Sequence, residues 1–192
     1  MLTLALALVL QGCPQRIRVA APSLRATVAT VSLVECGRRV AGPWPARVGY
    51  HGLSAHHREG DGTTPIGTFP IGPTVYGLDA NPGVHLAYHR LRCGDWWDED
   101  PASPTYNSFQ HLACGETPPF HGGSEALWRA QVAYREFAVI GYNASPVVSR
   151  RGSAIFLHDD RGHATNGCVS LPRPDLLRLL RRLRPGATIS IR

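Results

Sequence analysis

The sequence predicts a single domain of mainly β structure with small helices, a β-rich α+β fold. The chain has 192 residues, which is enough for one ordinary domain and a short leader. Hydrophobic residues make up 43% of the chain and charged residues 18%, a balance typical of globular proteins rather than disordered ones. The 20 glycines and 16 prolines favour frequent turns and few long helices.

The chain begins with an apolar run, MLTLALALVLQGC, that ends at Cys13. This run is too short to span a bilayer and has the length of a signal-peptide core, although no positive residue precedes it. Its end, Leu10 to Cys13, resembles a bacterial lipobox, in which the cysteine is lipidated after cleavage. We therefore expect an exported protein of the cell envelope, periplasmic or extracytoplasmic, whose lipidated Cys13 would anchor it at the membrane. The alternative is a buried N-terminal strand or helix. We assign residues 1–26 to a leader and linker and residues 27–192 to a single domain, which carries the candidate chemistry described below.

The elements that follow the leader are expected to be mostly strands. Residues 15–27 show no clear period and are assigned to the linker. Residues 27–50 hold short β-branched runs broken by glycine and proline, which predicts strands and turns. Residues 61–72 are expected to form a tight loop that feeds a strand. Residues 77–123 are long for a connection, and such loops are usually functional or disordered.

The C-terminal half is expected to contain two helices. Ser124 is a candidate cap for a helix over residues 124–137. Two short strands, AVIGYN and SAIFLHD, follow. A second helix is predicted over residues 174–186, where Pro174 begins it, leucines form an apolar stripe and Gly186 ends it. The segment ATISI is expected to be the last strand.

The five cysteines bear on both stability and chemistry. An exported protein permits disulfides, and Cys93 and Cys114, which flank a loop-like segment, are the preferred pair. A zinc site built from Cys93, His111 and Cys114 is an alternative, but no second Cys/His pair completes it, so no metal is expected. The partner of Cys36 stays open.

The net charge of +6 comes from arginine alone, because the chain contains no lysine. The arginines are scattered and form no basic stripe with interleaved aromatic residues, so nucleic acid is not an expected partner. A diffuse positive surface suits an anionic partner such as a cell wall or membrane surface, although a merely soluble basic surface explains it as well.

The stretch AIFLHDDRGHATNGCVSL carries the candidate chemistry. A cysteine attacks carbonyl groups as a thiolate and therefore needs a nearby base. His158 ends one apolar run and Cys168 begins the next, so neighbouring strands would bring imidazole and thiol together. Asp159 or Asp160 would orient the ring by accepting its second N–H. Gly167 lets backbone N–H groups approach a developing oxyanion.

Two alternatives stay open on spacing alone. Free cysteines are often simply buried, so Cys168 need not be catalytic. His163, on the loop itself, is a rival base, although a loop histidine is more often solvated.

Three motifs in this order resemble the L,D-transpeptidase catalytic domain, the YkuD-like family: GTTPIGTFPIG, IFLHDD and TNGCVSLP. They match its TPxGxF pattern, its upstream histidine and its Ser/Thr-His-Gly-Cys block. The resemblance covers most of the chain beyond residue 27 and implies a YkuD-like β-sandwich. It also implies that Cys168 is the nucleophile, that His158 is its base, and that Gly167 and Cys168 supply oxyanion N–H groups. Thr165 matches the Ser/Thr of the block and is a candidate substrate-binding residue.

The sequence departs from the family pattern at three points. Asn166 stands where the family usually has His, the gap from His to Cys is shorter, and Ser170 stands where Arg or Asn is common. An asparagine amide can still donate to an oxyanion, so Asn166 stays a candidate catalytic residue. Ser170 stays a candidate substrate-binding residue, with carboxylate recognition in question.

The resemblance implies an exported acyltransferase of peptidoglycan biosynthesis. The thiolate would attack a stem tetrapeptide, release D-Ala and pass the acyl group to an amine, forming a 3→3 cross-link without metal or cofactor. Carbapenem-type β-lactams would be covalent inhibitors. The alternatives are a carboxypeptidase or cysteine peptidase that uses water, and a non-catalytic cell-wall-binding domain. A papain-like order is disfavoured because no histidine follows Cys168.

Other polar and aromatic residues are candidates for substrate contacts or for structural roles. Tyr142 and Asn143 are candidate donors to substrate carbonyls, although turn formation explains the asparagine almost as well. Trp96 and Trp97, beside an acidic run, are interpreted as a partly buried loop anchor with a solvated acidic rim, and the alternative is that they line a substrate cleft or bind a cation. The remaining histidines are expected at the surface or in turns: His51, His56, His57 and His121.

Overall fold

The computed structural model describes residues 13–192, so the predicted leader up to Gly12 lies outside the described residues. The strands are β1 (Gln15–Ala20), β2 (Val28–Glu35), β3 (Arg38–Arg47), β4 (Leu53–Ser54), β5 (Thr64–Pro65), β6 (Gly67–Gly77), β7 (Ala87–Arg90), β8 (Asp95–Asp98), β9 (Ser108–His111), β10 (Glu125–Ala126), β11 (Glu136–Ile140), β12 (Phe156–Asp159), β13 (Val169–Leu171) and β14 (Thr188–Ile191). The helical elements are the 3₁₀ turn η1 (Leu127–Arg129) and the helix α1 (Arg173–Leu180).

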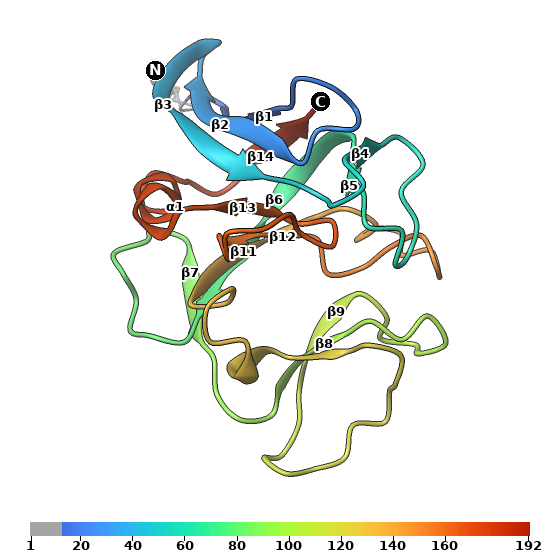
Figure 1. The fold of residues 1–192 in the computed structure, drawn as a ribbon. Coiled ribbons are helices and arrows are strands. Elements are labelled where there is room, and N and C mark those ends of the chain that lie inside the picture. Colours follow the sequence, from blue (N-terminus) through green and yellow to red (C-terminus); the bar gives the residue numbers. More distant parts are fainter. Residues whose placement is uncertain (1–12) are drawn as a thin grey trace, which may run out of the picture.

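Most strands belong to one large sheet, with the order β11-β12-β13-β3-β2-β1-β14-β6-β7. Because β11 also pairs with β6, the sheet closes on itself, and the two packed faces of the expected sandwich are parts of one sheet (Figure 1). Neighbouring strands are mostly antiparallel, with parallel pairs β1–β14, β12–β13 and β6–β7. The predicted β-rich class with small helical elements is confirmed.

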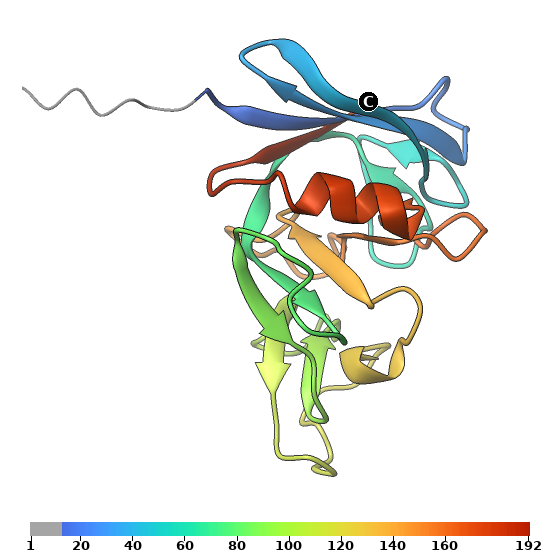
Figure 2. The ribbon, with the colours of Figure 1, turned by 90° about the vertical axis from the view of Figure 1, so that its left-hand side faces the viewer.

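Alternating apolar residues of these strands fill the inside of the sheet, and α1 packs against it (Figure 2). Leu176, Leu179 and Leu180 of α1 are fully buried, as is Leu183 in the turn that follows. The predicted C-terminal helix is therefore present but ends at Leu180 instead of Gly186.

A second, three-stranded sheet, β10-β8-β9, forms from the long segment that was expected to be a loop and from the residues after it. Figure 2 shows these strands as a lobe at one end of the large sheet. Trp97 anchors the lobe: its ring meets Phe156 of β12 edge-on, with 5.0 Å between centroids, and its indole N–H donates to Asn107 at 3.1 Å. The predicted anchoring role holds for Trp97, but the pair lies in strand β8 instead of a loop, and the expected solvated acidic rim is wrong at Asp98, which is fully buried and accepts from the Thr105 hydroxyl.

The linker assignment for residues 15–27 is corrected by β1, which lies inside the large sheet between β2 and β14. Its residues alternate strictly: Ile17 and Val19 are fully buried, whereas Arg16 and Arg18 are exposed. This alternation is the two-residue period of a half-buried strand, but it extends over only six residues.

The predicted helix over residues 124–137 is absent. The segment holds β10, the turn η1 and the start of β11 instead. Glu125 and Ala126 pair with β8, while Glu136 and Phe137 pair with Gly77 and Tyr76 of β6. Sheet pairing and tertiary burial therefore override the local helix preference.

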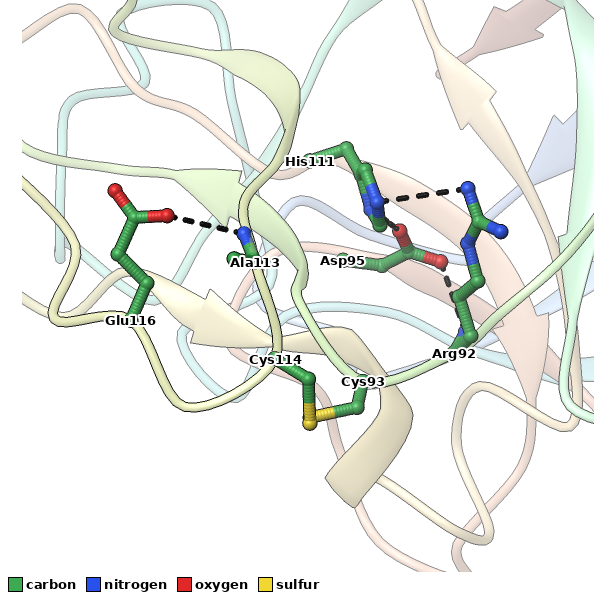
Figure 3. The surroundings of a disulfide bond; sticks show 7 residues. All are labelled: Arg92, Cys93, Asp95, His111, Ala113, Cys114 and Glu116. Atoms are coloured by element: carbon green, nitrogen blue, oxygen red, sulfur yellow. Dashed lines mark hydrogen bonds and ion pairs between the residues drawn. A yellow bond between two sulfur atoms is a disulfide. The ribbon is translucent and has the colours of Figure 1, made fainter.

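Two disulfides link segments close to strand ends. Cys93 and Cys114 are bonded, as predicted, across the base of the β8–β9 hairpin (Figure 3). The alternative zinc site thereby loses two of its ligands, and His111 donates to Asp95.

Cys13 is bonded to Cys36. This corrects the expectation that Cys13 is lipidated, because one sulfur cannot form both a thioether and a disulfide. Within residues 13–192, no helix has the length and apolar character needed to cross a membrane.

Candidate active site

The parallel pairing of β12 and β13 brings His158 and Cys168 to one face of the sheet. Leu157 lies opposite Val169 and His158 lies opposite Ser170. Leu157 and Val169 point into the main core, so the next side chains along each strand point to the other face. Cys168 precedes Val169 and packs against the second apolar cluster, which contains Phe156. The candidate base and nucleophile therefore share a face.

The Cys168 thiol is free and points toward the start of β12. Its Sγ donates to the carbonyl oxygen of Ala154 at 3.2 Å and accepts the backbone N–H of Phe156 at 3.3 Å. Burial raises the pKa of the Cys168 thiol, and the negative charges of Glu125 and Glu99 raise it further, whereas the Phe156 N–H opposes them. The resting group is thus a thiol, and a base must remove its proton before attack.

Cys168 borders two cavities. The larger, about 350 Å³, is also bordered by His57, Glu59, Glu99 and Glu125. The smaller, about 120 Å³, is also bordered by His158, Tyr134, Thr165, Ser170 and His163. The sulfur therefore lies between a larger and a smaller cavity, and His158 borders the smaller one.

The His158 ring is held by a backbone carbonyl. Nδ1 lies 2.7 Å from the carbonyl oxygen of Asp159, so Nδ1 carries the proton and Nε2 is left to accept one. Burial lowers the pKa of His158 to about 4, although the Asp159 carbonyl opposes the shift. His158 is therefore neutral near pH 7, which is the state that a general base needs.

This geometry corrects the predicted role of the Asp159 and Asp160 side chains. Asp159 orients His158 through its carbonyl, while its carboxylate points to the opposite face, beside Glu136. No described residue donates a hydrogen bond to either Asp159 carboxylate oxygen, although the side chain is buried. Asp160 instead accepts from Arg47 at 3.1 Å and from the Gly162 N–H at 3.0 Å.

The turn before Cys168 is held by Thr165. The Thr165 hydroxyl donates to the carbonyl oxygen of Cys168 at 2.7 Å and accepts the N–H of Gly167 at 3.2 Å. Both predicted roles change as a result: Thr165 positions the turn rather than offering a free hydroxyl, and the Gly167 N–H is already engaged. Gly167 has φ +140°, and a Cβ there would lie 2.9 Å from the Thr63 carbonyl oxygen, so only glycine fits.

Some of the other predicted site residues lie close to Cys168, and others do not. Asn166 is exposed and borders both cavities, so its amide can reach a bound carbonyl. Ser170 borders the smaller cavity, but its hydroxyl donates to Asp160 at 3.3 Å. His163 is exposed on the loop.

Tyr142 and Asn143 are not brought to the sulfur. The Tyr142 hydroxyl lies 3.0 Å from the His57 carbonyl oxygen and 2.8 Å from that of Arg151, and its ring borders a separate cavity of about 440 Å³. The Asn143 amide donates to the carbonyls of Val148 and Gly152. Their predicted substrate contacts are corrected: both side chains hold backbone of the following loop.

Several residues at the larger cavity escaped sequence reasoning. Glu59, Glu99 and Glu125 come from three distant segments, and no spacing pattern links them. Burial raises the pKa of Glu99 to about 9, and the charge of Glu125 adds to the shift. His57, expected at the surface, is buried, with 5% of its surface exposed.

Comparison with known proteins agrees with this geometry. The family model of the L,D-transpeptidase catalytic domain, YkuD, matches residues 23–191. The chain belongs to the L,D-transpeptidase catalytic domain family. An L,D-transpeptidase-type activity is therefore the general function that the family supports.

A structural neighbour carries the same family description. It is the crystal structure of an L,D-transpeptidase (Yku) from Stackebrandtia nassauensis, with 15% sequence identity and a TM-score of 0.41. The match covers 93% of this chain and 55% of the neighbour, so this chain spans about half of the neighbour's length. A comparison with curated proteins found no match.

Proposed function

We propose that the protein is an exported peptidoglycan L,D-transpeptidase with Cys168 as nucleophile and His158 as base. The observation that carries the proposal is the shared face and shared cavity of a free thiol and a neutral, carbonyl-oriented imidazole. The family membership defines the type of reaction, while the acyl donor and acceptor are part of the proposal.

In the first step, Nε2 of His158 takes the thiol proton and Sγ attacks the carbonyl of the third stem residue in a tetrapeptide. The Cys168 N–H and the Asn166 amide are the donors that would face the oxyanion. The C–N bond to D-Ala then breaks, the leaving amine takes the proton from His158, and a thioester remains on Sγ.

In the second step, an amine of a neighbouring stem attacks the thioester and forms a 3→3 cross-link. Water in place of the amine gives a carboxypeptidase. These steps use only side chains and backbone groups of this chain, so the proposal needs no metal or organic cofactor. A carbapenem would acylate the same sulfur by ring opening.

Export is supported by the two disulfides, Cys13–Cys36 and Cys93–Cys114. Disulfides persist in oxidising compartments such as the bacterial periplasm or the cell exterior. Peptidoglycan stems are found on that side of the membrane, so substrate and fold would meet there.

The test is incubation of the protein with a disaccharide-tetrapeptide, followed by mass spectrometry of peptides and of the intact protein. D-Ala release with cross-linked dimers supports the transpeptidase. D-Ala release without dimers supports the carboxypeptidase. No release together with pull-down by sacculi supports the wall-binding alternative. A Cys168→Ala variant that kept full activity would remove the nucleophile assignment, and a carbapenem adduct on Cys168 would support it.

A further inference from the structure

Cys168 is flanked by a second histidine that the mechanism above does not use. His57 lies in the loop between β4 and β5 and borders the larger cavity, whereas His158 borders the smaller one. A Cβ at Gly167, next to Cys168 in the chain, would lie 3.5 Å from Cε1 of His57. The imidazole therefore lies directly beside the backbone that presents the sulfur.

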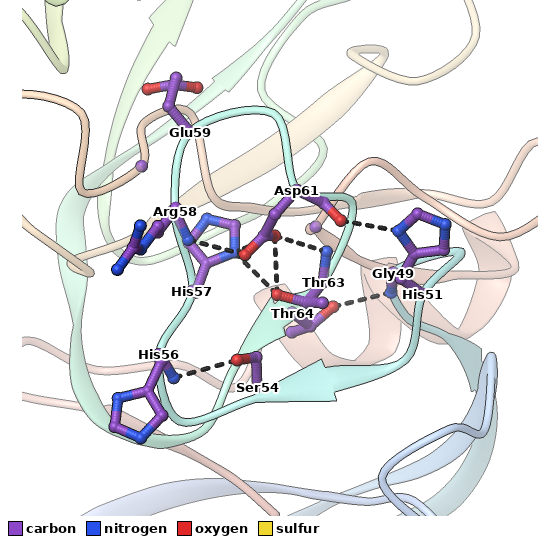
Figure 4. A network of polar contacts seen from close by, with 12 residues as sticks. Gly49, His51, Ser54, His56, His57, Arg58, Glu59, Asp61, Thr63 and Thr64 are labelled. Carbon is purple, nitrogen blue, oxygen red and sulfur yellow. Dashed lines mark hydrogen bonds and ion pairs between the residues drawn. The ribbon is translucent and has the colours of Figure 1, made fainter.

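The His57 ring is held in one orientation. Its Nδ1 lies 2.9 Å from Asp61 Oδ1 and 3.1 Å from the Thr63 hydroxyl, which itself donates to Asp61 (Figure 4). Asp61 also accepts the backbone N–H groups of Arg58 and Thr63 at 2.8 Å each. With Nδ1–H donated to Asp61, Nε2 carries the lone pair, which is the arrangement of an oriented general base.

Glycine at position 152 leaves room for the imidazole beside the cavity. A Cβ at Gly152 would lie 2.5 Å from Nε2 of His57, and Gly152 has φ +112°. The Tyr142 ring meets the imidazole edge-on, with 5.2 Å between centroids. The imidazole is thus buried, fixed by a carboxylate and placed at a cavity that the free thiol also borders.

The charges around the cavity indicate what the ring would act on. Glu59, Glu99 and Glu125 border the same space as His57. Glu59 is held by the hydroxyls of Tyr106 and Ser153, and Glu125 is held by the hydroxyl of Tyr134. Burial raises the pKa of Glu99 to about 9 and also raises that of Glu125, so Glu99 is protonated near neutral pH and the cavity offers carboxyl oxygens that accept N–H groups of an amine. An amine that enters as an ammonium group must lose a proton before it can attack a thioester.

We propose that His57, oriented by Asp61, is the general base of the second half-reaction and deprotonates an amine acceptor in the larger cavity. This inference rests on the proposed transpeptidase function. The acceptor enters as an ammonium group and first releases one proton to solvent. The neutral amine then attacks the thioester carbonyl, and its nitrogen gives a second proton to Nε2 of His57 as the new C–N bond forms. The C–S bond breaks with its electrons on Sγ, and the sulfur recovers a proton from the imidazolium. The two histidines thus divide the two half-reactions between the two cavities.

The groups that face His57 set the expected pH dependence of the transfer step. They are Asp61 on its own loop, Glu59 beside it, and the Tyr142 ring from the end of β11. Burial lowers the pKa of His57 below its usual value of 6.5, and Asp61 opposes the shift. The ring is therefore neutral at pH 7, and the rate of transfer should fall as the pH drops through this lowered pKa.

The experiment separates the half-reactions in a single turnover with the disaccharide-tetrapeptide, using intact-protein mass spectrometry and released D-Ala. In a His57→Gln variant we expect the D-Ala burst to stay within threefold of the parent. Transfer of the acyl group to an added stem amine should slow by about 100-fold, the lower range for loss of a general base, so that the thioester accumulates. Transfer should also lose its dependence on pH below neutrality. The matched control is His56→Gln, which changes an exposed neighbour on the same loop and should leave both steps unchanged.

The outcomes are distinct. If the parent protein shows neither a D-Ala burst nor a thioester, the proposed function fails and the role of His57 fails with it. If the parent turns over but His57→Gln transfers at the parental rate, or loses burst and transfer equally, only the role of His57 fails. Should His57→Gln not fold, as judged by thermal melting and by alkylation of Cys168 with iodoacetamide, Asp61→Asn replaces it. Asp61→Asn must show the same selective loss of transfer, and an equal loss in both steps contradicts the inference.

Discussion

Asp159→Asn should stabilise the protein at neutral and alkaline pH without impairing acylation of Cys168. The carboxylate of Asp159 is buried, and no described residue donates a hydrogen bond to it. It lies beside Glu136, whose own carboxylate is held by Arg173 at 2.6 and 2.9 Å. An asparagine amide removes the buried charge and supplies an N–H toward Glu136.

The size of the effect follows from the pKa of Asp159. Burial, and then the charge of Glu136, raise this pKa from 3.8 to about 7 in the folded protein. A carboxyl group with a raised folded pKa binds its proton more tightly when folded, so the wild-type protein loses stability as the pH rises from 3.8 to about 7. At about 1.36 kcal/mol per pKa unit, the full shift corresponds to about 4 kcal/mol, and partial relaxation of the site reduces the expected gain to about 2–4 kcal/mol.

The assay is urea unfolding of wild type and Asp159→Asn at about pH 4 and about pH 8, with acylation of Cys168 by a carbapenem measured in parallel. The stabilisation should be small at the lower pH and complete at the higher one. Acylation should stay within threefold, because His158 is oriented by the Asp159 carbonyl, which the substitution retains. A variant that is less stable at pH 8, or that loses acylation more than tenfold, would refute this reasoning.

Three further outcomes test the site and the fold. His158→Gln should slow acylation of Cys168 by 100-fold or more. Acylation of the wild-type protein should fall as the pH drops through about 4, because burial lowers the pKa of His158 to about 4. An acylation rate unchanged by either perturbation would exclude His158 as the base. Thr165→Val removes the hydrogen bonds to the Cys168 carbonyl and the Gly167 N–H. The free energy of unfolding, measured with urea, should fall by about 1–3 kcal/mol, and adduct formation on Cys168 should slow. Unchanged values would show that the turn keeps its conformation without the Thr165 hydroxyl. Replacing Cys93 and Cys114 together by Ala opens a loop with a sequence separation of 21 and should lower unfolding free energy by about 3 kcal/mol, with no loss expected if the loop is equally restricted in the unfolded chain.

The sequence by itself determined the strand-rich class, the Cys93–Cys114 pair, the C-terminal helix and the proximity of the candidate residues His158 and Cys168. Each of these depends on local or near-local information. Turn residues bound short β-branched runs, and the leucine stripe of α1 has a helical period. His158 lies in β12 and Cys168 directly precedes β13, the next strand along the chain and the partner of β12, so their approach needs no distant contact.

Only the tertiary structure decided the remainder of the site. Residues 124–137 favour a helix locally, yet pairing of Glu136 and Phe137 with β6 makes the end of this segment a strand. His57, Glu99 and Glu125 meet at Cys168 because closure of the large sheet and folding of the β8–β9 lobe bring distant segments together. The carbonyl of Asp159, rather than its carboxylate, orients His158 because alternate side chains of a strand point to opposite faces. Which atom a residue offers, and which distant residue lies beside it, depends on strand register and sheet closure, and these are set by the energy of the whole chain.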